Sequence, residues 1–74
     1  MHIETLKIFC DLVDLQSFSL AAERNFITQS AVSQQIRALE DKFKRRLLER
    51  VRGRREIKLT PSGEVFYRES RNVL

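Results

Sequence analysis

The chain contains few of the residues from which enzyme and cofactor sites are most often built. Its 74 residues include one histidine, one cysteine and two glycines. His2 stands beside the N-terminus and Cys10 lies in an apolar stretch, so neither has a partner at the spacing of a metal ligand or of a nucleophile and its base. Two separate glycines do not make a phosphate-binding loop. We therefore expect no enzyme activity, no metal site and no cofactor.

Long apolar segments are also absent. The N-terminus lacks a basic segment followed by an apolar one, so it does not resemble a signal peptide. No apolar run approaches the length needed to span a membrane. One cysteine cannot form an internal disulfide, which fits a reducing compartment. These absences predict a cytoplasmic protein without a membrane partner.

Positive charge is concentrated in one segment of the chain. The net charge is +4, but residues 42–58 hold nine lysines and arginines against two acids. Residues 1–41 hold only three basic residues against six acids. A dense basic segment beside a mixed-to-acidic body predicts a polyanionic partner. The alternative, a solvated run of charge that aids solubility, is less favoured because of the motifs described below.

Apolar periodicity and capping residues predict four helices. The expected helices are about Ile3 to Leu15, Ser17 to Asn25, Gln29 to Phe43 and Pro61 to Leu74. The hydroxyls of Ser17, Thr28 and Thr60 are suited to capping the last three, and proline favours the first position of the fourth. Residues 56–59 alternate polar and apolar, and Gly53 supplies a turn, which predicts a two-stranded hairpin before the last helix. The fold class is therefore mainly α with a small β-hairpin.

Three local features of these helices carry expectations of their own. Asn25 suits a left-handed backbone conformation in the short connection between the second and third helices. The third helix has a core stripe made of Val32, Ile36, Leu39 and Phe43. The apolar face of the first helix is too wide for one small core to cover. Either its own domain buries it on two sides, or part of it contacts a second subunit.

The other face of the third helix carries groups suited to reading DNA. That face presents Gln29, Ser30, Ser33, Gln34 and Arg37, with no acid before Glu40. A helix fits the major groove, where its N-terminal residues meet the base edges, and glutamine pairs well with adenine. Arg37 is placed to reach a guanine or a phosphate, and the helix N-terminus offers free N–H groups to a phosphate. Together with the hairpin, this order of elements predicts a winged helix-turn-helix.

The hairpin tip is rich in arginine. Arg52, Arg54 and Arg55 surround Gly53, an arrangement that fits a wing entering a narrow minor groove, where the negative potential is deepest. For each arginine alone, a phosphate contact or a plain surface charge is an equally good interpretation.

Four blocks of the sequence resemble one family. The blocks are residues 18–24 (FSLAAER), 28–40 (TQSAVSQQIRALE), 47–50 (LLER) and 59–63 (LTPSG). In order and spacing they are similar to the N-terminal DNA-binding domain of LysR-type transcriptional regulators. The resemblance implies a winged helix-turn-helix over residues 1–60 and the start of a dimerising linker helix over residues 61–74. It also implies a homodimer on double-stranded DNA, and a larger effector-binding domain, outside this chain, that takes the small molecule.

The resemblance also assigns residues. It places Gln29, Ser30, Ser33 and Gln34 in the DNA-contacting stretch and Arg52 and Arg54 in the wing, and it makes Thr60 a helix cap near the backbone. The full set of expected DNA-binding residues is Thr28, Gln29, Ser30, Ser33, Gln34, Arg37, Arg52, Arg54, Arg55 and Thr60.

Three positions depart from the family pattern. Ser30 replaces a common proline and Gln34 a common arginine, which predicts weaker phosphate affinity and a different base preference. Lys44 stands where glycine is usual, so either it adopts a left-handed conformation at a cost of about 1 kcal/mol or the helix ends differently. The charges of Lys44, Arg45 and Arg46 either contact the DNA backbone or are solvated.

Two other functions compete with sequence-specific DNA binding. A domain that coats DNA or RNA without specificity would use the same basic segment, with an affinity that depends on salt but not on sequence. A protein-interaction module of winged-helix shape is the second. The uncharged reading face and the arginine-rich tip argue against that module.

Overall fold

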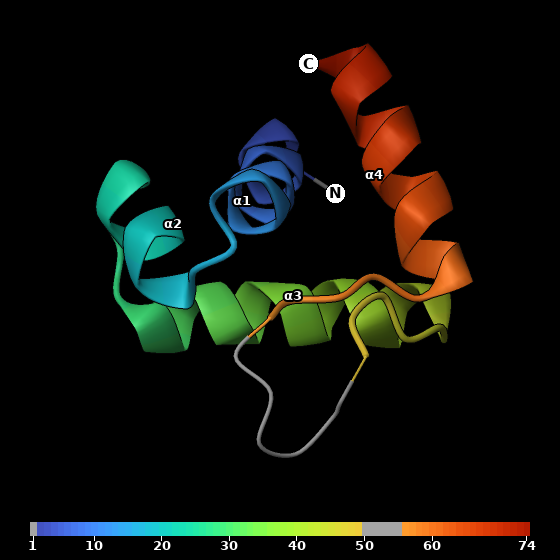
Figure 1. Cartoon of the computed structure of the whole chain (residues 1–74), viewed down its shortest axis with the longest axis horizontal. Coiled ribbons are helices and arrows are strands. Elements are labelled where there is room, and N and C mark those ends of the chain that lie inside the picture. The colour runs from blue at the N-terminus through green and yellow to red at the C-terminus, as the bar shows by residue number, and fades with distance from the viewer. Residues whose placement is uncertain (1, 50–55) are drawn as a thin grey trace.

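Four helices form the part of the chain that the computed structural model describes, residues 2–49 and 56–74. They are α1 (Ile3–Leu15), α2 (Phe18–Arg24), α3 (Gln29–Phe43) and α4 (Pro61–Val73). Figure 1 shows α1, α2 and α4 on one side of α3, which runs along the base of the molecule. The mainly helical fold is therefore confirmed. In the described ranges, no helix has the length and apolar character needed to cross a membrane.

The expected capping hydroxyls begin three of the helices. The side-chain oxygen of Ser17 accepts from the backbone N–H of Leu20, and that of Thr28 from Ala31, both at 3.0 Å. The Thr60 hydroxyl accepts from the N–H of Gly63 at 3.0 Å, with proline in the first turn of α4. Each bond satisfies a backbone donor that has no partner within its helix. The sequence predictions for these three helix starts are confirmed.

The prediction of a left-handed Asn25 is wrong. Asn25 has a φ of −101°, and the left-handed residue is the next one, Phe26, with a φ of 57°. The Asn25 side chain explains the difference, because its amide nitrogen donates to the backbone oxygen of Ala21 at 2.8 Å and to the Asp11 carboxylate at 2.9 Å. Asparagine stabilises this turn by side-chain bonding. At the end of α3, Lys44 does adopt the left-handed conformation, with a φ of 53°.

The core lies where α1, α2 and α3 meet. Val32, Ile36 and Leu39 of the predicted stripe are buried, but Phe43 is 41 % exposed. Phe43 is the last residue of α3, and its ring packs against Phe66 of α4, itself only partly buried, at 5.4 Å between centroids. Its assignment as a core residue is therefore corrected to a boundary residue.

The other helices of the domain bury most of the wide apolar face of α1. It packs against all three other helices. Its side chains buried there are Leu6, Ile8, Phe9, Cys10 and Leu12. Ile3, at its start, stays exposed. Burial by the domain is therefore the better of the two interpretations for the middle of α1.

The predicted hairpin is described only at its base. Leu48 and Leu59 form an isolated antiparallel bridge, and the N–H of Glu49 donates to the carbonyl of Lys58 at 2.8 Å. Over residues 2–49 and 56–74 there is no extended strand. The turn at Gly53 and its arginines lie outside the described residues, so the full hairpin stays a prediction.

Gly63 lets α4 begin directly against the segment that leaves α3. The N–H of Thr60 donates to the carbonyl of Leu47 at 3.0 Å, which draws the two backbones together. A Cβ atom at Gly63 would lie 2.0 Å from that same carbonyl oxygen. Only glycine fits this approach without a shift of the backbone.

Candidate nucleic-acid interface

The exposed face of α3 is the best-defined candidate site. Its buried face, through Val32 and Ile36, packs toward α1 and α2. The opposite face is left uncovered by the other helices (Figure 1). A helix with one uncovered polar face is an element able to enter a groove of a nucleic acid.

Five predicted site residues gather in one hollow on this face. The hollow is lined by Phe18, Gln29, Ser30, Ser33, Gln34 and Arg37. Gln29, Ser30, Gln34 and Arg37 are exposed, and Ser33 is half-buried. The hollow therefore offers amides, hydroxyls and one guanidinium, the groups that bond to base edges and phosphates. It contains no acid.

Phe18 is the lining residue that the sequence analysis did not name as a site residue. It is half-buried and packs against the core cluster, yet it also reaches the hollow. Helical spacing identifies its buried side but not this second surface, because that surface depends on how α2 lies across α3. Its position directly after the Ser17 cap, beside the start of α2, was the only available signal.

Two other expected site residues are engaged within the protein. The Thr28 hydroxyl caps α3, so it lies beside the first residues of the reading face. The Thr60 hydroxyl donates to the carbonyl of Arg46 while it accepts from the N–H of Gly63. Thr60 thus joins the start of α4 to the segment after α3. Arg52, Arg54 and Arg55 lie outside the described residues.

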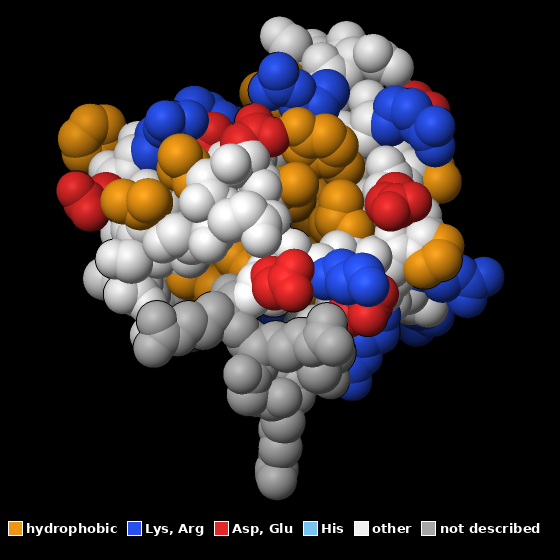
Figure 2. Space-filling model, in the orientation of Figure 1, with side chains coloured by type: hydrophobic (Ala, Val, Ile, Leu, Met, Phe, Trp, Pro, Cys, Tyr) orange, Lys and Arg blue, Asp and Glu red, His pale blue; other side chains and the backbone are white. Residues whose placement is uncertain are grey.

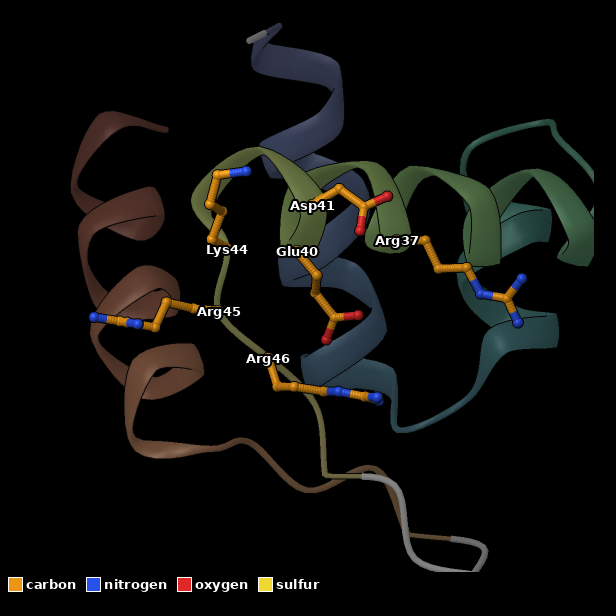
Figure 3. A pocket seen from close by; sticks show the side chains of 6 residues that line it. All are labelled: Arg37, Glu40, Asp41, Lys44, Arg45 and Arg46. Atoms are coloured by element: carbon orange, nitrogen blue, oxygen red, sulfur yellow. The ribbon is translucent and has the colours of Figure 1, made fainter.

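A second hollow continues from the first along α3. It is lined by Arg37, Glu40, Asp41, Lys44, Arg45 and Arg46, as Figure 3 shows. Arg37 belongs to both hollows. Figure 2 shows lysine and arginine side chains gathered near the C-terminal end of α3. The uncovered face therefore changes from neutral polar groups at its start to charged groups at its end.

A charged cluster holds α2 and the following turn in place beneath the site. The Asp11 carboxylate accepts from Lys7 Nζ at 2.8 Å and from Asn25 Nδ2 at 2.9 Å. Arg24 lies 3.6 Å from its other oxygen. Burial alone would raise the pKa of Asp11, but the bonds from Lys7 and Asn25 and the two positive charges outweigh it, so that pKa lies below its ordinary value. The cluster therefore ties the end of α2 and the turn residue Asn25 to α1.

The single cysteine and the acidic residues are candidate metal ligands and nucleophiles within residues 2–49 and 56–74. In these ranges no group of three or more His, Cys, Asp or Glu side chains is placed to hold a metal ion. Cys10 is buried, and burial together with the Asp14 charge raises the pKa of its thiol. A buried thiol of raised pKa is a packing group rather than a nucleophile.

One family profile matches most of the chain. The profile for "Bacterial regulatory helix-turn-helix protein, lysR family" matches residues 3–64. The chain is 39 % identical over 74 residues to the HTH-type transcriptional regulator BenM of Acinetobacter baylyi, covering 100 % of this chain and 24 % of BenM. It is 38 % identical over 72 residues to the uncharacterized HTH-type transcriptional regulator YhjC of Escherichia coli, covering 97 % of this chain and 23 % of YhjC.

A solved structure agrees with the sequence comparison. The crystal structure of the BenM_DBD/catB site 1 DNA complex superimposes with a TM-score of 0.89 at 38 % identity, covering 99 % of this chain and 79 % of that one. The chain spans about a quarter of the length of the curated relatives it matches.

Proposed function

The chain belongs to the lysR family of bacterial regulatory helix-turn-helix proteins, and from this we propose that it is the DNA-binding domain of a bacterial transcription regulator. The observation that carries the proposal is the uncovered face of α3, where five polar residues line one acid-free hollow. The DNA-bound structure of the similar BenM_DBD supports double-stranded DNA as the partner. Because that partner is bacterial DNA, the protein acts in the cytoplasm.

Helix α3 enters the major groove with its first turns toward the bases. Gln29 and Gln34 offer amides that bond bidentately to adenine, and Ser30 and Ser33 offer hydroxyls that bond to several bases. Thr28 holds the start of the helix, where free backbone N–H groups meet a phosphate. Arg37, one turn after the serines, bonds to a guanine or to the phosphate beside it.

The basic segment between α3 and α4 forms the wing. Arg52, Arg54 and Arg55 enter the minor groove, whose negative potential attracts guanidinium groups. The bridge between Leu48 and Leu59 places both ends of this segment side by side, as a hairpin requires. Thr60 contributes at the wing's base, next to Arg46, as the cap of α4.

The functional unit is a homodimer. Residues 1–60 form the winged helix-turn-helix, and residues 61–74 begin a linker helix through which two copies associate. Figure 2 shows hydrophobic side chains gathered between α1 and α4. Ile3 of α1 and Val65 and Val73 of α4 are exposed, which supplies apolar area for a partner copy. An effector-binding domain, outside this chain, senses the small molecule.

Selection from random duplexes followed by titration tests this function. The chain is expected to enrich a site with two-fold symmetry, and to bind it more tightly than a scrambled duplex at two salt concentrations. Equal binding to both duplexes would mean non-specific coating, and no binding at low salt would exclude both nucleic-acid functions. If the chain is instead a protein-interaction module, it should bind no duplex even at low salt.

Two substitutions distinguish base-specific contacts from general electrostatic attraction to DNA. Gln34→Ala is expected to relax the base preference, at a cost of about 1 to 3 kcal/mol for the preferred duplex, because a base contact carries sequence information. Arg54→Ala is expected to lower the affinity for all duplexes by the same factor. Competition binding against a panel of single-base variants measures both. An unchanged preference profile for Gln34→Ala would show that the reading face is elsewhere.

A further inference from the structure

The cations at the end of α3 are not neutralised by neighbouring acids. In the second hollow, Arg37, Lys44, Arg45 and Arg46 outnumber Glu40 and Asp41. Lys44, Arg45 and Arg46 are all exposed. Over residues 2–49 and 56–74, the ion pairs involve Asp11 and Asp14 and leave these three side chains out. An unpaired, outward-facing cluster of this kind attracts an anion.

The cluster continues the reading face. At about 100° per residue, Ser30, Ser33 and Arg37 fall within an arc of about 60° on α3, and Lys44, the residue at which the helix ends, lines the second hollow together with Arg37. Because Arg37 also lines the first hollow, it connects the two hollows along this side of the molecule. Figure 3 shows Arg46 extending beneath Glu40 toward the side of Arg37, whereas Arg45 extends the other way, toward α4. Lys44 and Arg46 are thus the cations best placed beside this face.

The length of α3 places these cations beyond the bases that it reads. Fifteen residues make a helix about 22 Å long, whereas the major groove is about 12 Å wide. A helix that crosses the groove with its first turns against the bases therefore extends past the groove edge before its last turn. Its C-terminal end then meets the sugar–phosphate strand at the edge of the groove.

We propose that Lys44 and Arg46, next to Arg37, form a phosphate-binding surface that extends the DNA footprint beyond the bases read by α3. This proposal rests on the proposed function and adds a second contact to it. For Lys44 and Arg46, it adopts the first of the two interpretations of these charges, contact with the DNA backbone.

The two acids of the hollow differ in their effect. The Glu40 carboxylate accepts from the backbone N–H groups of Leu47 and Leu48, at 2.8 and 3.2 Å, and so anchors the segment that carries Arg46. Asp41 is exposed and lies on the same face, between Arg37 and Lys44 along the helix. Its charge opposes a phosphate there. Removing that charge therefore strengthens the proposed contact.

The test compares two double variants that lose the same charge. Lys44→Gln/Arg46→Gln removes the proposed surface. Lys42→Gln/Arg68→Gln removes two exposed cations elsewhere, since Lys42 lies about 140° around α3 from Arg37 and Arg68 lies on α4. Binding to the selected duplex, with long and short flanks, is measured by anisotropy from 50 to 300 mM salt.

We expect the Lys44/Arg46 variant to lose about ten-fold or more in affinity on the long duplex. The slope of log affinity against log salt should fall by about two, because each lost phosphate contact removes roughly 0.9. The base preference of the variant should be unchanged. On the duplex with short flanks, the affinity of the wild-type chain should fall to that of the variant. Asp41→Asn should bind more tightly, a gain that misfolding cannot produce.

Equal losses in the two double variants, or an unchanged salt slope, would overturn the proposal while leaving the proposed function intact. Wild-type binding that is the same on long and short duplexes would also overturn it. If the wild-type chain binds no duplex at all, the proposed function fails, and this surface fails with it.

Discussion

At the scale of single residues, the turn between α2 and α3 depends on two side chains that behave in opposite ways. Asn25 bonds to Ala21 and Asp11 and keeps an ordinary backbone. Phe26 takes the left-handed conformation with 95 % of its surface exposed. A bulky residue in this conformation is strained by about 1 to 2 kcal/mol, and its exposed ring buries nothing in return.

Replacing Phe26 by glycine is therefore expected to stabilise the domain. Phe26→Gly removes the strain, partly offset by the greater freedom of glycine in the unfolded chain, for a net gain of about 0.5 to 1 kcal/mol. Thermal unfolding should show a melting temperature several degrees higher. Phe26→Ala, which loses the ring but keeps the Cβ atom, should stay near the wild type. If Phe26→Ala raised the melting temperature as much as Phe26→Gly, the exposed ring and not the backbone conformation would be the destabilising feature.

Asp11 makes stability depend on pH. Its pKa is depressed in the folded chain, below the ordinary value of about 3.9. The stability that its ionised form contributes is therefore present above pH 4 and is lost as the pH falls through the folded pKa. Asp11→Asn should lower the free energy of unfolding at pH 7 by about 1 to 3 kcal/mol, with a smaller difference from the wild type at pH 3.

Urea unfolding at a series of pH values measures this effect. Glu23→Gln is the control, because Glu23 is exposed at the far side of α2 and forms no ion pair with the described residues; its stability should stay within 0.5 kcal/mol of the wild type. A constant gap between Asp11→Asn and the wild type from pH 3 to 7 would contradict the assignment.

At the scale of elements, the start of α4 depends on an absent side chain. Alanine in place of glycine usually stabilises a helix by about 1 kcal/mol. At Gly63 we expect alanine to destabilise the fold instead, because the new methyl group would lie 2.0 Å from the Leu47 carbonyl oxygen. Gly63→Ala is expected to destabilise by about 1 to 3 kcal/mol, as measured by chemical denaturation. Ser62→Ala, one residue earlier, is the control, and a Gly63→Ala chain as stable as Ser62→Ala would refute the close approach.

The helices could be predicted from sequence because their signals are local. The hydroxyls of Ser17, Thr28 and Thr60 lie next to the apolar patterns they precede, and all three cap as expected. The reading face follows from the same periodicity, since residues opposite Val32 and Ile36 must face outward. These predictions needed only the 3.6-residue repeat and the chemistry of a helix start.

Features that depend on contacts between distant segments could not be predicted in this way. Gln16 donates to the carbonyl of Ile57 at 2.9 Å and accepts from its N–H at 3.1 Å, although 41 residues separate them. The bond between Asn25 and Asp11, and the place of Phe18 in the first hollow, likewise depend on how helices cross. Periodicity identifies which side of a helix is buried, but not what lies against it.

At the scale of the whole molecule, exposed apolar side chains on α4 predict self-association. Val73 is 64 % exposed, and a charge there would be buried without a partner in the proposed dimer, at a high cost. Val73→Asp is expected to weaken dimerisation at least ten-fold in sedimentation equilibrium and to abolish cooperative binding to a duplex with two half-sites. Binding to a single half-site should be unchanged. Equal sedimentation of variant and wild type would place the dimer contact elsewhere.

Phe66 carries the ring contacts between α4 and the rest of the domain. Its ring stands edge-on to Phe9 of α1, at 5.2 Å and 79°, and is tilted against Phe43 of α3, at 5.4 Å and 55°. These ring contacts are made by packing alone. Beyond Phe66, the Tyr67 hydroxyl donates to the Asp14 carboxylate of α1 and Arg71 pairs with the same carboxylate, while Thr60 and Gly63 hold the near end of α4. A force applied to the far end of α4 would therefore be shared between the Phe66 ring, which leads to α3, and the bonds to Asp14, which lead to α1.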